Sequence, residues 1–114
     1  MIHFPFINRQ AVILTPKQPY IDWVRKVSIG GKYSFEGHVN VIYLISETSD
    51  KDDAIAILRR KSKTIFETEL SSWVVFENAW PIQRGWKTFN KWFSFSIIDI
   101  VHDIAIEGLE REEL

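Results

Sequence analysis

The chain has 114 residues, of which 46% are hydrophobic, 14% aromatic and 25% charged. A chain of this length buries roughly two thirds of its unfolded surface, which predicts a single compact domain over residues 1–114 with an acidic, frayed tail over 108–114. The sequence contains no cysteine, which excludes disulfides, thiolate metal sites and cysteine nucleophiles. No stretch resembles a signal peptide or a membrane span, so we expect a cytoplasmic protein that does not bind membranes.

The net charge is −1, and it is unevenly distributed along the chain. Residues 99–114 carry six acids and one base, whereas the preceding residues carry thirteen bases and nine acids. The densest basic run, residues 59–63, spreads its charges around the helix that it is predicted to form. We therefore expect no specific nucleic-acid ligand.

The first predicted elements are a short strand followed by an amphipathic helix. The run Ala11–Thr15 is continuously apolar, as in a strand buried on both faces. Pro16 ends this strand because it cannot donate to a sheet ladder, and Pro19 suits the first turn of a helix. The apolar face of that helix recurs at i, i+3, i+4 and i+7 with Tyr20, Trp23, Val24 and Val27.

A second strand and a long helix follow. Val39–Ser46 is rich in β-branched and aromatic residues of both parities, which predicts a central strand. Turn and cap residues then precede a helix from Lys51 to about Trp73, with Asp52 and Asp53 in its first turn. The predicted apolar stripe of this helix contains Ile55, Leu58, Ser62, Ile65, Phe66 and Trp73.

The last third of the chain predicts a short helix and a long closing strand. Residues 74–86 are irregular, Lys87–Trp92 is helical in pattern, and Phe93–Glu107 begins with a period of two. The apolar parity changes near Ile97, which predicts a bulge; a helix beginning near Asp99 is the alternative. Together these elements predict an α+β fold, with a small three- or four-stranded sheet and two main helices packed on one face.

The stretch over residues 8–23 contains the best candidate for a ligand site. A turn that leads into a helix exposes backbone N–H groups and a partial positive charge, and Lys17 lies in this turn. Two interpretations remain open: an anion site made of Lys17, Arg9 and Asn8, and a proline-initiated helix with a solvated lysine. Arg9 lies ~15–20 Å away along the strand and reaches Lys17 only if the chain folds back.

Two further groups of residues suggest sites. Asp99, His102 and Asp103 have metal-ligand spacing on a helix, but on a strand they point to opposite faces, so we expect no metal and no cofactor. Trp73 and Trp92 are expected in the core. A loop rich in proline and glycine presents a possible exposed aromatic contact made of Trp80, Arg84 and Trp86.

The start of the chain, N-R-x-A-V-I-L-x-P-K-Q-P-Y-x-D-W, resembles that of a family of short uncharacterised bacterial proteins. A strand ending in L-I-S-E, a helix with F-E-T-E-L-x-x-W, a W-P turn and a closing strand are also similar, so the resemblance covers most of the chain. It implies one compact α/β unit, adds weight to residues 8–23 belonging together, and assigns no activity.

No GxSxG, HExxH or kinase-like motif is found, so an enzyme is not expected. We predict a non-enzymatic binding or interaction module whose partner is another protein or a second copy. The alternative is a small ligand-binding protein or enzyme that takes an anionic small molecule at the corner formed by residues 8–23.

Overall fold

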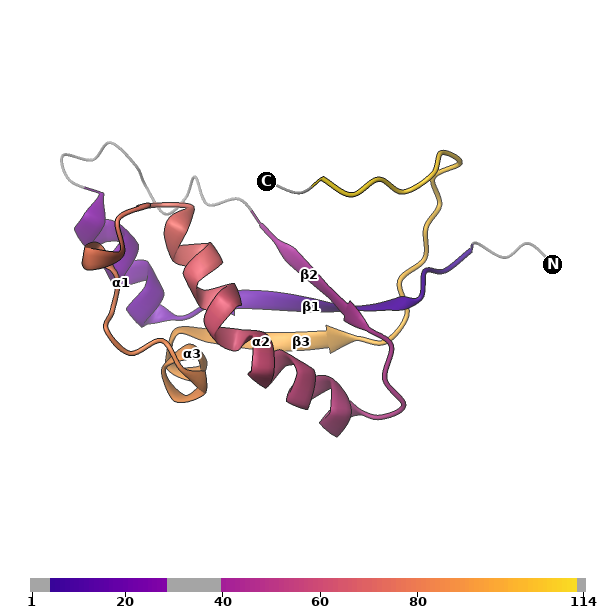
Figure 1. Ribbon diagram of the computed structural model, residues 1–114, viewed down its shortest axis with the longest axis horizontal. Coiled ribbons are helices and arrows are strands. Elements are labelled where there is room, and N and C mark those ends of the chain that lie inside the picture. The colour runs from indigo at the N-terminus through magenta and orange to yellow at the C-terminus, as the bar shows by residue number, and fades with distance from the viewer. Residues whose placement is uncertain (1–4, 29–39, 113–114) are drawn as a thin grey trace.

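A computed structural model describes residues 5–28 and 40–112 (Figure 1). The elements follow in the order β1 (Arg9–Pro16), α1 (Gln18–Val27), β2 (Ile42–Ser46), α2 (Lys51–Ser71), the single 3-10 turn η3 (Glu77–Ala79), α3 (Trp86–Trp92) and β3 (Phe93–Ile98). This arrangement confirms the predicted α+β fold with a small sheet.

The three strands form an antiparallel sheet in the order β2-β1-β3. Ala11 lies between Leu44 on one side and Ile98 on the other. The central strand is therefore β1, and the prediction that Val39–Ser46 forms a central strand is wrong. β2 has apolar residues on both faces, but those on the face away from the helices, Ile42 and Leu44, are exposed. Residue 39 lies outside the part of the chain that the structure describes.

The helices cover one face of the sheet. Val12, Ile45 and Phe93 point toward them and belong to the buried core. The next residues along β1 point to the other face, where Ile13 is 37% exposed. Ala11 on this face is 5% exposed, so the strand is buried on both faces near its start but not along its length, because no helix in residues 5–28 and 40–112 covers the second face.

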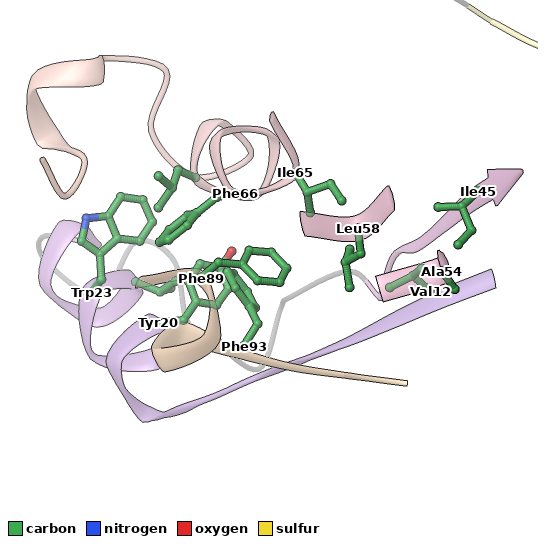
Figure 2. Packing of buried hydrophobic residues seen from close by; sticks show 12 residues of the cluster. Val12, Tyr20, Trp23, Ile45, Ala54, Leu58, Ile65, Phe66, Phe89 and Phe93 are labelled. Carbon is green, nitrogen blue, oxygen red and sulfur yellow. The ribbon is translucent and has the colours of Figure 1, made fainter. Parts of the chain in front are cut away.

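Aromatic rings fill the centre of the core, and Phe93 lies in the middle of them (Figure 2). Its ring centroid lies 4.9 Å from that of Tyr20, 5.6 Å from that of Phe66 and 5.4 Å from that of Phe89. These four rings come from α1, α2, α3 and β3, so they join every main helix to the sheet. Half-buried rings, among them Trp73 and Trp92, pack around this centre.

Helix α2 is the longest element, and its ends follow from local chemistry. The Asp50 carboxylate accepts a hydrogen bond from the Asp53 N–H at 2.9 Å and caps the first turn. The helix ends at Ser71, slightly before the predicted end. Its buried side comprises Ala54, Leu58, Ser62, Ile65, Phe66, Glu69 and Leu70.

The closing strand is shorter than predicted. β3 ends at Ile98, and the chain beyond it is irregular apart from an isolated bridge between Phe6 and His102. The prediction of a strand with a bulge continuing to Glu107 is wrong. Ile98 pairs with Ala11, close to the start of β1, so little of the central strand remains to pair with a longer β3. The alternative helix near Asp99 does not form either.

The aromatic core gives the first testable expectation. Phe66→Ala removes a fully buried ring, and we expect it to lower the free energy of unfolding by about 3–5 kcal/mol. Ile82→Ala, at a side chain that is 94% exposed, serves as the control and should change stability by about 0.5 kcal/mol or less. Urea unfolding followed by tryptophan fluorescence measures both. A loss below about 1 kcal/mol for Phe66→Ala contradicts this packing.

Candidate functional site

Lys17 fastens the β1–α1 turn to the end of α3. Its backbone N–H donates to the Trp92 carbonyl at 2.8 Å, and its ammonium Nζ donates to the Asn90 carbonyl at 2.7 Å. Carbonyls in the last turn of a helix carry a partial negative charge, which favours a cation there. The ammonium is therefore already directed at a protein acceptor.

Asn8 and Arg9 lie at the opposite end of β1. The Arg9 Nη1 donates to the Asn8 carbonyl and to Asn8 Oδ1, both at 2.8 Å. The eight residues of β1 span about 25 Å, so a small ligand cannot contact both Arg9 and Lys17. Asn8 and Arg9 instead line a shallow depression of about 340 Å³ with Ile7, Leu44, Leu109 and Arg111.

Arg84 holds the loop before α3 in place. Its side chain is 12% exposed and forms ion pairs with Glu67 at 2.9 Å and with Glu77 at 2.8 Å. The guanidinium also lies over the ring of Trp80, 5.5 Å from its centroid, and Trp86 stacks on a core phenylalanine. The two tryptophans of the predicted aromatic contact are thus half-buried at the rim of the core. The exposed apolar side chains of this loop are Val75, Phe76 and Ile82.

A polar depression of about 700 Å³ lies where β3 ends beside the start of α2. Gln10, which is 6% exposed, connects its walls. Its Oε1 accepts from the Thr48 hydroxyl at 2.6 Å and from the Thr48 N–H at 3.2 Å, and its Nε2 donates to Asp99 at 3.2 Å. The buried polar groups here are satisfied by one another, so this network ties β1 to the α2 turn and to the end of β3.

A second groove, of about 310 Å³, lies between β2 and α2. Figure 1 shows α2 crossing the sheet at an angle, from the end of β3 toward β2. The strand provides Tyr43–Ser46 to this groove. The helix provides residues at i, i+4, i+7, i+8 and i+11, which lie on one side of α2: Ile57, Lys61, Thr64, Ile65 and Thr68.

Among residues 5–28 and 40–112, β2 is an edge strand without the usual protection. In natural proteins exposed edges commonly carry a charged residue, a proline or a bulge, which prevents pairing with another chain. The β2 sequence IYLIS has neither a charge nor a proline, and its pairing with β1 is continuous. Its side chains Ile42 and Leu44 are 59% and 47% exposed on the face away from the helices. Within the described chain, this edge and the groove beside it form the best surface for adding a strand.

A buried polar network fixes α2 against β2 next to this groove. The Tyr43 hydroxyl donates to Glu69 Oε2 at 3.2 Å, and the Tyr20 hydroxyl donates to the Glu69 carbonyl at 3.2 Å. Burial raises the pKa of Tyr20 to about 12, and the Glu69 carboxylate adds to the effect. Burial, followed by the same carboxylate, raises the pKa of Tyr43 still further. Both hydroxyls are therefore neutral at physiological pH.

Other site classes find no support in residues 5–28 and 40–112. No cluster of three or more histidine, aspartate or glutamate side chains there could hold a metal ion. No helix in these ranges has the length and apolarity needed to cross a membrane. Comparisons with protein-family models, with curated proteins and with solved structures gave no significant match.

The β2 edge and its groove were not found by sequence reasoning. An apolar run of both parities was interpreted as burial on two faces, although an exposed edge strand produces the same pattern. The sequence of α2 contained one indication of the groove. Ile57 lies outside the predicted stripe and recurs with Lys61, Thr64 and Thr68 on a second side of α2.

The contacts of Lys17 predict a modest structural role. We expect Lys17→Ala to lower the free energy of unfolding by about 0.5 kcal/mol and Lys17→Glu by about 1 kcal/mol, because the variants lose, and then reverse, a favourable charge at a helix end. Lys63→Glu, at an exposed position in the middle of α2, is the control for a charge reversal.

Calorimetry with phosphate and acetate tests the binding role of the same residue. If this corner binds an anion, that binding is lost in Lys17→Glu. Wild-type protein that binds neither anion, or a variant that binds as well as wild type, shows that the corner is only structural.

The raised pKa of Tyr20 predicts a loss of stability in alkali. The folded state favours the neutral phenol, so this stabilisation is complete below the pKa of about 10 of an unfolded tyrosine and is lost as the pH rises through about 12. Between about pH 8 and about pH 11, Tyr20 should cost the wild type about 1–2 kcal/mol of unfolding free energy. Tyr20→Phe has no phenol at this position, so its free energy of unfolding, measured with urea, should decrease by about 1–2 kcal/mol less than that of wild type over this pH range. Equal decreases in the two proteins contradict the assignment.

Proposed function

We propose that this protein is a non-enzymatic interaction module that binds an extended segment of a partner protein as an additional strand along β2. The observation that supports this most directly is the coincidence of an unprotected apolar edge strand with a groove beside it. An extended peptide that pairs with a sheet edge gains main-chain hydrogen bonds, and pockets for alternate side chains give specificity. β2 provides the main-chain hydrogen-bonding groups, and the groove provides the pocket for side chains.

The alternation of a strand determines what the bound segment must contain. Every second side chain of an added strand would point into the groove, where Ile57 and Ile65 offer apolar contacts. The intervening side chains would lie on the opposite face, beside Ile42 and Leu44, which are exposed in the free protein. Both faces of the added strand would therefore bury apolar surface, which favours a segment of β-branched and aliphatic residues.

The other edge of the sheet is less suited to this role. The depression beside β3 is bordered by Asp50, Lys51 and Asp99, and its buried amide already bonds within the protein. An incoming apolar side chain would desolvate these groups without replacing their hydrogen bonds. The proposed strand addition therefore takes place at β2.

An anionic small molecule at residues 8–23, the alternative function, has weaker support. Lys17 donates its ammonium to a helix carbonyl, and Arg9 lies at the other end of β1. The interaction module is therefore the proposed function; the resemblance of the sequence implies a bacterial protein, and the absence of cysteine and of a signal-peptide pattern favours the cytoplasm.

A synthetic peptide tests strand addition. The probe is a fluorescein-labelled heptapeptide, Thr-Val-Thr-Gln-Thr-Val-Thr, with blocked ends, whose Val and Gln side chains share one face when it is extended. Fluorescence anisotropy measures its binding to the folded protein. We expect Thr64→Trp, which fills the groove, to weaken binding at least tenfold, because the indole occupies the space that the peptide side chains need.

Ala56→Trp is the matched control, since it adds the same side chain to an exposed position on another side of α2. We expect this variant to bind within twofold of wild type. No binding by wild-type protein, or equal binding by the two tryptophan variants, contradicts strand addition at this groove. Circular dichroism of each variant confirms that it is folded.

A further inference from the structure

The helix side of the groove is positively charged. Lys61 lines the groove and is exposed. Arg60 precedes it, and no acidic residue interrupts the run over residues 59–63. The Lys61 ammonium has no carboxylate partner among the described residues.

The remaining lining of the groove carries no compensating charge. Its strand side is Tyr43–Ser46, in which the tyrosine hydroxyl is neutral because burial and a nearby carboxylate raise its pKa. Its helix side adds two isoleucines and two threonines to the lysine. A bound segment that covers Lys61 would desolvate an ammonium, and this cost is smallest if the segment brings an opposite charge to it.

We propose that the partner segment is an acidic strand, in which apolar residues flank a glutamate or aspartate that faces the groove and pairs with Lys61. This inference rests on the proposed function, because it specifies the chemistry of the segment that adds to β2. It restricts the partner from any apolar extended segment to one with a carboxylate on the same face as its apolar side chains.

The same charges disfavour a second copy of the chain as the occupant. Antiparallel pairing of β2 with β2 of another copy would make one continuous sheet with both α2 helices on the same face. The Lys61 side chains of the two copies would then lie on the helix sides that face the new junction. Like charges brought together in this way oppose association, whereas an acidic strand meets them favourably.

The charge preference also predicts a dependence on salt. An ion pair at the rim of a groove is partly screened, and its contribution decreases as the ionic strength rises. The preference for an acidic peptide should therefore be largest at low salt. The apolar and main-chain contribution should persist at high salt.

Three matched peptides separate this inference from the proposed function. They share the heptapeptide sequence and carry Glu, Gln or Lys at the central position. For wild-type protein in about 0.05 M salt we expect the Glu peptide to bind about tenfold more tightly than the Lys peptide, with the difference reduced in about 0.5 M salt. Lys61→Glu should reverse the order of the Glu and Lys peptides.

Lys63→Glu is the control, because it changes net charge equally but lies about 200° around the helix from Lys61. It should preserve the order of the peptides. Equal binding of the three peptides to wild type, still weakened by Thr64→Trp, overturns the acidic-strand inference and leaves strand addition standing. Binding of none of them overturns both. A dimer in sedimentation that Thr64→Trp dissociates assigns the groove to a second copy instead.

Discussion

The path of α2 across the sheet is the constraint on which the rest of the structure depends. Three strands present one face to the helices, and α2, with 21 residues and a length of about 30 Å, is the longest of these helices. α2 crosses the sheet at an angle (Figure 1), and a depression lies on either side of the helix, one beside β3 and one beside β2. The depression beside β3 contains the hydrogen-bond network around Gln10, whose polar groups are satisfied. The other is the groove beside β2.

Contacts at both ends of β1 maintain this path. At one end, Phe93 and the rings around it join all the main helices to the sheet, and Lys17 attaches the first turn to α3. At the other end, Gln10 attaches β1 to the turn before α2. Between them, Tyr43 and Glu69 join β2 to α2. The groove is therefore bordered by elements with fixed positions, and a preformed site loses less conformational entropy on binding.

Local sequence patterns predicted most elements but not their neighbours. The Pro16–Pro19 corner, the capped start of α2 and the Phe/Ser alternation of β3 follow from short-range chemistry, and each was predicted close to its observed place. The order of strands depends on pairings between distant segments, so the edge position of β2 could not be inferred from its composition. The distance between Arg9 and Lys17 followed from strand geometry. The groove could not be predicted, because Thr64 and Thr68 line it only when α2 lies beside β2, and this placement depends on tertiary packing.

Amide hydrogen exchange of the folded protein with and without the Glu heptapeptide tests the central claim most directly. Main-chain pairing with an added strand must slow the exchange of outward-facing amides in Ile42–Ser46. We expect that slowing at β2, with little change at the outer edge of β3, Phe93–Ile98. Slowing at β3 or in the loop before α3, with β2 unchanged, would contradict strand addition at β2.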